Sequence, residues 1–201
     1  MEGIDKKNGG AKIVHERDEG MRPGTTFEGL SKLPALKKGV GLVTAGTSSQ
    51  ICDGAACVLI MNEEGLRKSG LKPRAKIISL ALAGADPKVM LGGPIPASKT
   101  ALAKAGLKIE DIDLYELNEA FAPVPLAWAK AVGADYNKLN VNGGAMALGH
   151  PLGGTGAKLM ATLLHELERR NKKYGLLAIC EGGGTANATI IETMGGASAK
   201  L

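Results

Sequence analysis

The sequence contains few aromatic residues and few cysteines, and it has no long apolar run. Six aromatic residues (one Trp, three Tyr and two Phe) provide few platforms for stacking nucleic-acid bases. The three cysteines show neither a C-x-x-C spacing nor a Cys/His ligand spacing, which disfavours a disulfide framework and a metal site. No apolar run approaches the roughly 20 residues that cross a bilayer. We therefore expect a protein of a reducing compartment, with no membrane span and no bound metal.

The charge balance is moderately basic. The 201 residues include 25 Lys and Arg against 20 Asp and Glu, a formal net charge of +5. This surplus favours an anionic partner, but the basic residues are dispersed, so we expect a phosphorylated small molecule rather than nucleic acid. Apolar residues make up 44% of the chain and the mean hydropathy is +0.02, which predicts a globular fold. The charged, Gly-rich start, residues 1–10, does not resemble a signal peptide.

Apolar patterns of strand type and helix type alternate after residue 40, which predicts a layered α/β fold. Residues 1–38 carry no clean period and are predicted to be irregular, without a core. Residues 176–180 and 188–191 are close enough to pair as antiparallel strands. The other predicted elements are strands at 55–61, 77–83 and 113–117, and helices at 63–68, 98–105 with Ser98 as its cap, 119–132 and 155–170.

The glycine clusters do not match a nucleotide-binding loop. A P-loop needs Lys and a hydroxyl directly after its last Gly, but Ala157 follows Gly156. The dinucleotide fingerprint fails because Leu159 stands where its third Gly belongs.

A histidine and a cysteine lie in glycine-rich turns that a ligand could approach closely. His150 lies among small residues before a helix predicted to start near Thr155, whose free N–H groups would face the turn. A structural histidine in a tight turn explains the same pattern equally well. Cys180 closes an apolar strand and precedes 182–184, whose N–H groups could bind an oxyanion. The alternative is a buried, inert cysteine.

Asn118 stands at a predicted strand-to-helix junction, where functional side chains often lie in α/β folds. Because Asn is among the best helix N-caps, the local sequence favours a cap over a functional role.

Three motifs taken together resemble the carboxyl-terminal signatures of the thiolases. They are N-E-A-F-A at 118–122, G-H-P-L-G at 149–153 and C-E-G-G-G at 180–184, in that order. Further matches extend the resemblance from about Asp18 to Thr193, and lie at 53–56, 93–97, 141–144 and 186–189.

The resemblance implies a thiolase-like layered α/β sandwich, present as the carboxyl-terminal half with the end of the loop domain. Residues 1–48 would end the loop domain, 49–70 the amino-terminal domain, and 71–201 would form the carboxyl-terminal domain. The amino-terminal half, which carries the nucleophilic cysteine in this family, would be missing. Cys52 and Cys57 lack the motif of that cysteine, so we expect the isolated chain to be inactive without a partner half.

The resemblance also assigns roles to the motif residues. His150 would activate the nucleophilic cysteine and share in a first oxyanion hole, and Asn118 would hold the water that completes it. Cys180 would act as the acid and base at the α-carbon, and the Gly182 N–H would join a second oxyanion hole. Coenzyme A, a substrate rather than a cofactor, would contact a further group: Arg22, Ala45, Ser49, Met90, Ala120 and Phe121.

The implied activity is acyl transfer between CoA thioesters, by thiolysis of a 3-ketoacyl-CoA or by Claisen condensation. Glu181 after Cys180 resembles degradative thiolases more than biosynthetic ones. The alternative function is a non-catalytic CoA-binding or assembly subunit. For the full-length form, the resemblance implies a homo-oligomer. We expect a cytoplasmic protein, and residues 199–201, A-K-L, leave a peroxisomal address as the alternative.

Overall fold

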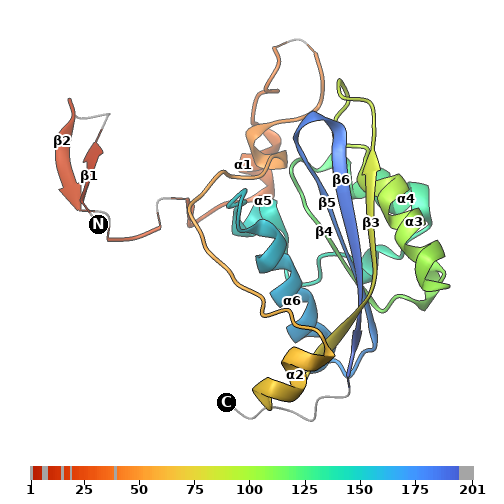
Figure 1. Ribbon diagram of the computed structural model, residues 1–201. Helices are drawn as coiled ribbons and strands as arrows, with labels where there is room; N and C mark the ends of the chain where they lie inside the picture. The colour runs from red at the N-terminus through yellow and green to blue at the C-terminus, as the bar shows by residue number, and fades with distance from the viewer. Residues whose placement is uncertain (1, 6–8, 15, 19, 39, 195–201) are drawn as a thin grey trace. The chain divides into compact units, whose positions relative to one another are not determined.

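The computed structural model describes residues 2–5, 9–14, 16–18, 20–38 and 40–194 (Figure 1). The predicted peroxisomal address at 199–201 lies outside them. The chain divides into two compact units between residues 33 and 34. The first holds a hairpin of β1 (Glu2–Asp5) and β2 (Ala11–Val14), and the helix α1 (Phe27–Ser31). None of its described residues is buried, as predicted, but the hairpin and helix are more regular than predicted.

The second unit is built on a four-stranded sheet in the order β3-β6-β5-β4 (Figure 1). Its strands are β3 (Ala75–Gly84), β4 (Leu114–Leu117), β5 (Tyr174–Cys180) and β6 (Thr185–Thr193). The strands β4 and β5 are parallel, whereas β6 is antiparallel to both β5 and β3. The 3-10 turn η5 (Gly182–Gly184) joins β5 to β6, so the predicted antiparallel pair is confirmed.

Helices cover both faces of this sheet, which confirms the predicted layered α/β fold. The helix α6 (Thr155–Arg169) covers one face, while α3 (Pro94–Ala105) and α4 (Pro123–Val132) cover the other (Figure 1). The face under α6 is closed by an apolar stripe at helical spacing. Leu159, Leu163 and Leu167 are almost fully buried against the sheet residues Leu114, Leu177 and Ile191.

The opposite face is centred on Trp128 of α4. Its ring meets that of Tyr115 edge-on, with ring centroids 5.4 Å apart, and its Nε1 donates to Ser98 Oγ at 2.9 Å. The predicted cap at Ser98 is wrong, because α3 begins four residues earlier at Pro94. Proline suits the first helical position, where the missing N–H has no partner in any case. The predicted stop at Gly106 is confirmed by its left-handed φ of 67°.

The interpretation of Asn118 as a helix cap is also wrong. The helix α4 starts at Pro123, and Ala122 is its N-cap, so the predicted start at residue 119 is too early. Residues 118–122 form a connecting segment instead, because the Ala122 N–H donates to Thr47 O and the Ala120 carbonyl accepts from Ser49 N. Pairing with a distant segment thus replaces the helical turn that the sequence favours.

The predicted buried strand at 55–61 is not formed. Residues 52–62 have no regular secondary structure, and the exposed fractions of Leu59 and Ile60 are 72% and 67%. An apolar run becomes a strand only where a neighbour accepts its backbone hydrogen bonds. The described part of the chain offers this run none in a sheet.

Two short helices flank these elements. The helix α2 (Glu63–Ser69) is capped by Asn62 and ends at Gly70, as its charge pattern predicts. The helix α5 (Ala145–Leu148), which was not predicted, lies directly before His150. Within the described ranges, no helix combines the length and apolar character that a bilayer span requires.

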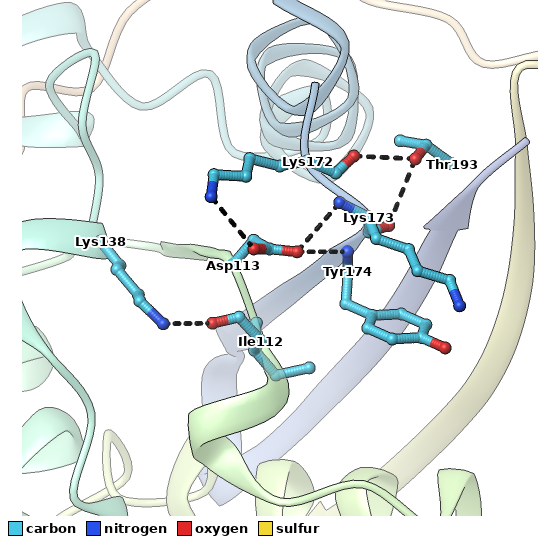
Figure 2. Close-up of polar contacts among 7 residues, drawn as sticks. All are labelled: Ile112, Asp113, Lys138, Lys172, Lys173, Tyr174 and Thr193. Carbon is cyan, nitrogen blue, oxygen red and sulfur yellow. Dashed lines mark hydrogen bonds and ion pairs between the residues drawn. The ribbon is translucent and has the colours of Figure 1, made fainter. Parts of the chain in front are cut away.

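Asp113 connects the start of β4 to the start of β5 (Figure 2). Its Oδ2 accepts from the backbone N–H groups of Lys173 and Tyr174, both at 2.9 Å. Its other oxygen lies 3.7 Å from Lys172 Nζ. Together these contacts fix where β5 begins relative to β4.

Close packing of α6 on the sheet depends on Gly175. A Cβ there would lie 2.7 Å from Leu167 Cδ1 and 2.9 Å from Leu163 Cγ. We expect Gly175→Ala to lower the free energy of unfolding by about 1–3 kcal/mol through overpacking, as measured by urea denaturation. Gly84→Ala is the matched control in a strand, because nothing lies within 4 Å of its Cβ position. Equal stability of the two variants would contradict this account.

Candidate active site

The three sequence motifs meet where the parallel strands β4 and β5 end. Asn118 follows β4, Cys180 is the last residue of β5, and His150 follows α5. The Asn118 N–H donates to Ala178 O at 3.1 Å, which places Asn118 beside the end of β5. Ligand sites in open α/β sheets form at this carboxyl edge.

Asn118 connects the other two residues and is 1% exposed. Its Nδ2 lies 3.4 Å from His150 Nε2, and its side chain lies close enough to Cys180 to lower the pKa of that thiol. Its Oδ1 is buried and has no protein partner. A buried amide oxygen without a partner is costly, so this atom suits a water or a ligand donor.

The imidazole of His150 is held in one tautomer. His150 Nδ1 lies 2.6 Å from Thr155 Oγ1, and that hydroxyl donates its single proton to Pro151 O. Nδ1 must therefore carry a proton and donate it, which leaves Nε2 as an acceptor toward Asn118. Burial, and secondarily the charge of Lys158, lower the pKa of His150. A neutral imidazole with an unprotonated Nε2 can act as a base.

Cys180 carries a proton where His150 Nε2 has none. It is 9% exposed, and burial raises the pKa of its thiol, an effect that the neighbouring backbone and, to a smaller extent, the Asn118 amide partly offset. The thiol is therefore protonated at neutral pH and can serve as an acid. Gly182 begins η5, and the first amides of such a turn have no acceptor inside it. Gly184 must be glycine, because a Cβ would lie 2.6 Å from Ala85 O.

Glu119, which the sequence interpretation missed, holds the segment that leads to His150. Its carboxylate accepts from Asn140 Nδ2 at 2.9 Å and from the Met146 N–H in the first turn of α5 at 3.1 Å. A Cβ on Gly144 would overlap that carboxylate. Asn140 also exchanges two hydrogen bonds with the backbone of Leu117. The two adjacent motif residues thus differ in role: Asn118 contacts His150, whereas Glu119 supports the helix α5 that precedes His150.

The predicted coenzyme A residues fall into two groups. Ser49, Ala120 and Phe121 lie together, since Ser49 N donates to Ala120 O and Ser48 bridges to Phe121. Phe121 also lines an apolar pocket of about 440 Å³, together with Val89 and Leu91 on either side of Met90.

The other predicted residues of this group are more exposed or belong to the first unit. Ala45 is exposed at the start of the turn η2 (Ala45–Thr47). Arg22 belongs to the first unit, where its Nη1 donates to Gly20 O. The part of the chain that the structure describes contains no cluster of His, Cys, Asp and Glu able to hold a metal ion.

Glu116 is a second group that the sequence interpretation missed. It lies on β4, is 2% exposed, and its Oε2 has no partner. Burial, reinforced by the negative charge of Glu119, raises the pKa of Glu116 to about 8. The sequence predicted a strand at 113–117, and all four residues of the observed strand β4 are buried.

Two family models match this chain. The family model of the thiolase C-terminal domain matches residues 71–193, and that of the thiolase N-terminal domain matches residues 3–64. The chain belongs to the thiolase family. The predicted fold class and family are thereby confirmed.

Individual thiolases are similar over nearly the whole chain. A steroid 3-ketoacyl-CoA thiolase of Mycobacterium tuberculosis is 55% identical over 177 residues, which are 88% of this chain and 43% of that protein. The human mitochondrial 3-ketoacyl-CoA thiolase is 47% identical over 193 residues, 96% of this chain and 49% of that protein. The chain thus spans about half the length of the curated relatives it matches.

Solved structures of related enzymes also superpose on this chain. The acetyl-CoA acetyltransferase of Bacillus anthracis superposes with a TM-score of 0.83 at 44% identity, covering 92% of this chain and 47% of that one. The human mitochondrial 3-ketoacyl-CoA thiolase in complex with CoA gives a TM-score of 0.80 at 46% identity, covering 92% and 46%.

The contact between His150 and the Thr155 hydroxyl leads to a testable prediction about the tautomer of His150. Imidazole ¹⁵N spectra of the neutral side chain are expected to show the proton on Nδ1. Thr155→Val removes the acceptor and should shift the tautomer ratio toward Nε2–H by about 2- to 12-fold, equivalent to a hydrogen bond of about 0.5–1.5 kcal/mol. Thr155→Ser keeps the hydroxyl and should behave as the original chain. A proton on Nε2 in the original chain would contradict the assignment.

Glu116 predicts a pH dependence of stability. Its raised pKa means that the unfolded chain ionises this carboxyl from about pH 4.5, whereas the folded chain keeps the proton up to about pH 8. Stability from the neutral form is complete below pH 4.5 and falls as pH rises to 8, by about 1.4 kcal/mol per pH unit at most.

Urea denaturation at pH 5, 6.5 and 8 measures this effect. Glu116→Gln cannot ionise, so its stability relative to the original chain should increase with pH over that range. Glu63→Gln, at an exposed position of α2, is the control and should show no such trend. A constant difference between Glu116→Gln and the original chain at all three pH values would contradict burial of a neutral Glu116.

Proposed function

We propose that this chain provides the acid–base part of a thiolase active site, for acyl transfer between coenzyme A thioesters. The observation that supports the proposal most directly is the contact of Asn118 with both His150 and Cys180. One of these groups is a neutral base and the other is a protonated acid, as reversible proton transfer requires. Thiolytic cleavage of a 3-ketoacyl-CoA is the favoured direction, because several relatives carry that name.

In the proposed reaction, His150 Nε2 accepts the proton of a nucleophilic cysteine as its sulfur attacks the 3-keto carbonyl. The resulting imidazolium and a water held by Asn118 then donate to the oxyanion. The unprotonated Nε2 and the unpartnered Asn118 Oδ1 support these roles. Thr155 keeps Nδ1 protonated, so that Nε2 alone takes part.

Cys180 acts at the second carbon centre. When the C–C bond breaks, its thiol donates a proton to the α-carbon of the departing acetyl-CoA. The resulting thiolate then takes the proton of incoming coenzyme A, whose sulfur forms a bond to the acyl carbon. The nucleophilic cysteine leaves that carbon and takes its proton back from the His150 imidazolium. The raised pKa of Cys180 supports the donor step, and the Gly182 N–H is suited to the enolate oxygen.

Coenzyme A itself is proposed to reach this site along Ser49, Met90, Ala120 and Phe121. The backbone pairing of Ser49 with Ala120 and the apolar surface at Phe121 suit a pantetheine arm. Arg22 and Ala45 remain proposed contacts by family resemblance alone.

The nucleophilic cysteine is proposed to come from a partner segment equivalent to the amino-terminal half of a thiolase. Cys57 is exposed, and Cys52, whose sulfur lies beside Gly149, lacks the sequence motif of the family's nucleophile. Exposed apolar side chains of 58–60 and of β3, where Leu80 and Leu82 are 59% and 82% exposed, provide a surface for such a partner.

Reconstitution of activity tests the proposal. The 201-residue chain is assayed for acetoacetyl-CoA thiolysis alone, and as a fusion behind the part of the Mycobacterium tuberculosis thiolase that it does not cover. We expect activity only in the fusion. His150→Ala and Cys180→Ala should each lower kcat by about 10²- to 10⁴-fold, the usual contribution of an acid–base group.

Matched controls are available within the chain. His165→Ala and Cys57→Ala replace exposed residues of the same types, and both should keep activity within about twofold. Activity of the isolated chain would show that a nucleophile lies within these 201 residues. An inactive fusion that still binds coenzyme A would favour the alternative of a non-catalytic binding subunit.

A further inference from the structure

The peptide group that joins Gly149 to His150 is held on both sides. The His150 N–H donates to Gln50 O at 2.7 Å. The Gly149 carbonyl accepts from Lys158 Nζ at 2.9 Å, and the same ammonium lies 3.3 Å from Leu148 O. A rotation of this peptide would move the imidazole, so these contacts determine where His150 points.

Lys158 reaches this peptide from the same helix that holds the imidazole ring. It follows Thr155 by three positions on α6, a spacing that places both side chains on one helix face. The first turn of α6 therefore binds His150 twice, at the ring through Thr155 and at the preceding carbonyl through Lys158.

The lysine also completes α5, which is only four residues long. The last carbonyl oxygens of a helix receive no hydrogen bond from within that helix, and their partial negative charge attracts a cation. Leu148 ends α5, and Gly149 is its C-cap. Glu119 meets the opposite end of α5 through the Met146 N–H. A carboxylate at the start and an ammonium at the end thus fix the turn that leads to His150.

We propose that Lys158 is a positioning residue of the candidate active site, which fixes the Gly149–His150 peptide so that the imidazole faces Asn118. This inference rests on the function proposed above. Lys158 itself contacts backbone carbonyls and need not touch a substrate. Its expected contribution is to the rate of the chemical step rather than to substrate binding.

The electrostatic surroundings give this role a distinct signature. Titratable groups near His150 and Lys158 come from each neighbouring element: Cys180 on β5, Glu116 on β4, Glu119 after β4, Glu166 on α6, and Cys52 and Asp53 in the segment beside Gly149. Because the pKa of Glu116 is raised to about 8, Glu116 is largely neutral at pH 7 and does not cancel the ammonium. Loss of the Lys158 charge should therefore raise the pKa of His150.

The first test uses the 201-residue chain and needs no activity. The ¹⁵N imidazole signals of His150 are titrated in the original chain, Lys158→Met, Lys158→Arg and Lys130→Met, the last an exposed lysine of α4. We expect Lys158→Met to raise the pKa of His150, whereas Lys158→Arg and Lys130→Met leave it in place. If Lys158→Met does not fold, Lys158→Gln replaces it, as a neutral side chain that still donates an N–H.

The second test uses the fusion described above. Lys158→Met should lower kcat by about 10- to 100-fold, the scale expected for a misplaced catalytic group, with KM within about twofold. The acidic limb of its kcat/KM profile should move to higher pH, and Lys158→Arg should restore both properties. These readouts separate positioning of His150 from a general loss of stability.

The two tests separate this inference from the proposed function. An inactive fusion of the original sequence would remove the proposed function, while the His150 titration would still report on Lys158. A folded Lys158→Met or Lys158→Gln chain with unchanged His150 titration would overturn the inference. So would a fusion in which Lys158→Met keeps the kcat of the original sequence.

Discussion

Packing of α6 on the sheet determines where the first turn of this helix meets His150. The leucines of this helix are buried against Leu114, Leu177 and Ile191, and Gly175 lets the helix approach closely. The helix therefore begins beside the ends of β4 and β5. Its first turn then holds the His150 ring and backbone, while the strand ends provide Asn118 and Cys180. The apolar contacts of the α6 leucines with the sheet thus set the geometry of the polar contacts around His150.

Burial gives the site its chemical asymmetry. His150 is partly buried and Cys180 is buried, and desolvation favours the neutral form of each. For histidine this lowers the pKa and yields a base, whereas for cysteine it raises the pKa and yields an acid. One environment therefore produces both partners of a proton transfer. Asn118, whose amide contacts both, keeps one buried oxygen unpartnered, which is consistent with a site arranged for a ligand or water.

Much of the fold could be predicted from local pattern. The stripe of leucines in α6, the left-handed caps at Gly70 and Gly106, and the antiparallel pair of β5 and β6 follow from short-range rules. The predicted strand at 55–61 failed for a tertiary reason, because an apolar run records a tendency to be buried but does not supply the neighbour. The cap assigned to Asn118 failed because residues 120 and 122 pair with a distant segment.

Three motifs in a fixed order identify the family from the residues alone, and with it the three side chains of the site. How those side chains are held depends on contacts between distant parts of the folded chain. The contacts of Thr155 and Lys158 with the His150 segment depend on the angle at which α5 leads into α6, and the neutral state of Glu116 depends on burial between β4 and α6. Residue types and spacings encode local conformation. Hydrogen-bond partners and pKa values depend instead on which distant groups come together and on how much water remains between them.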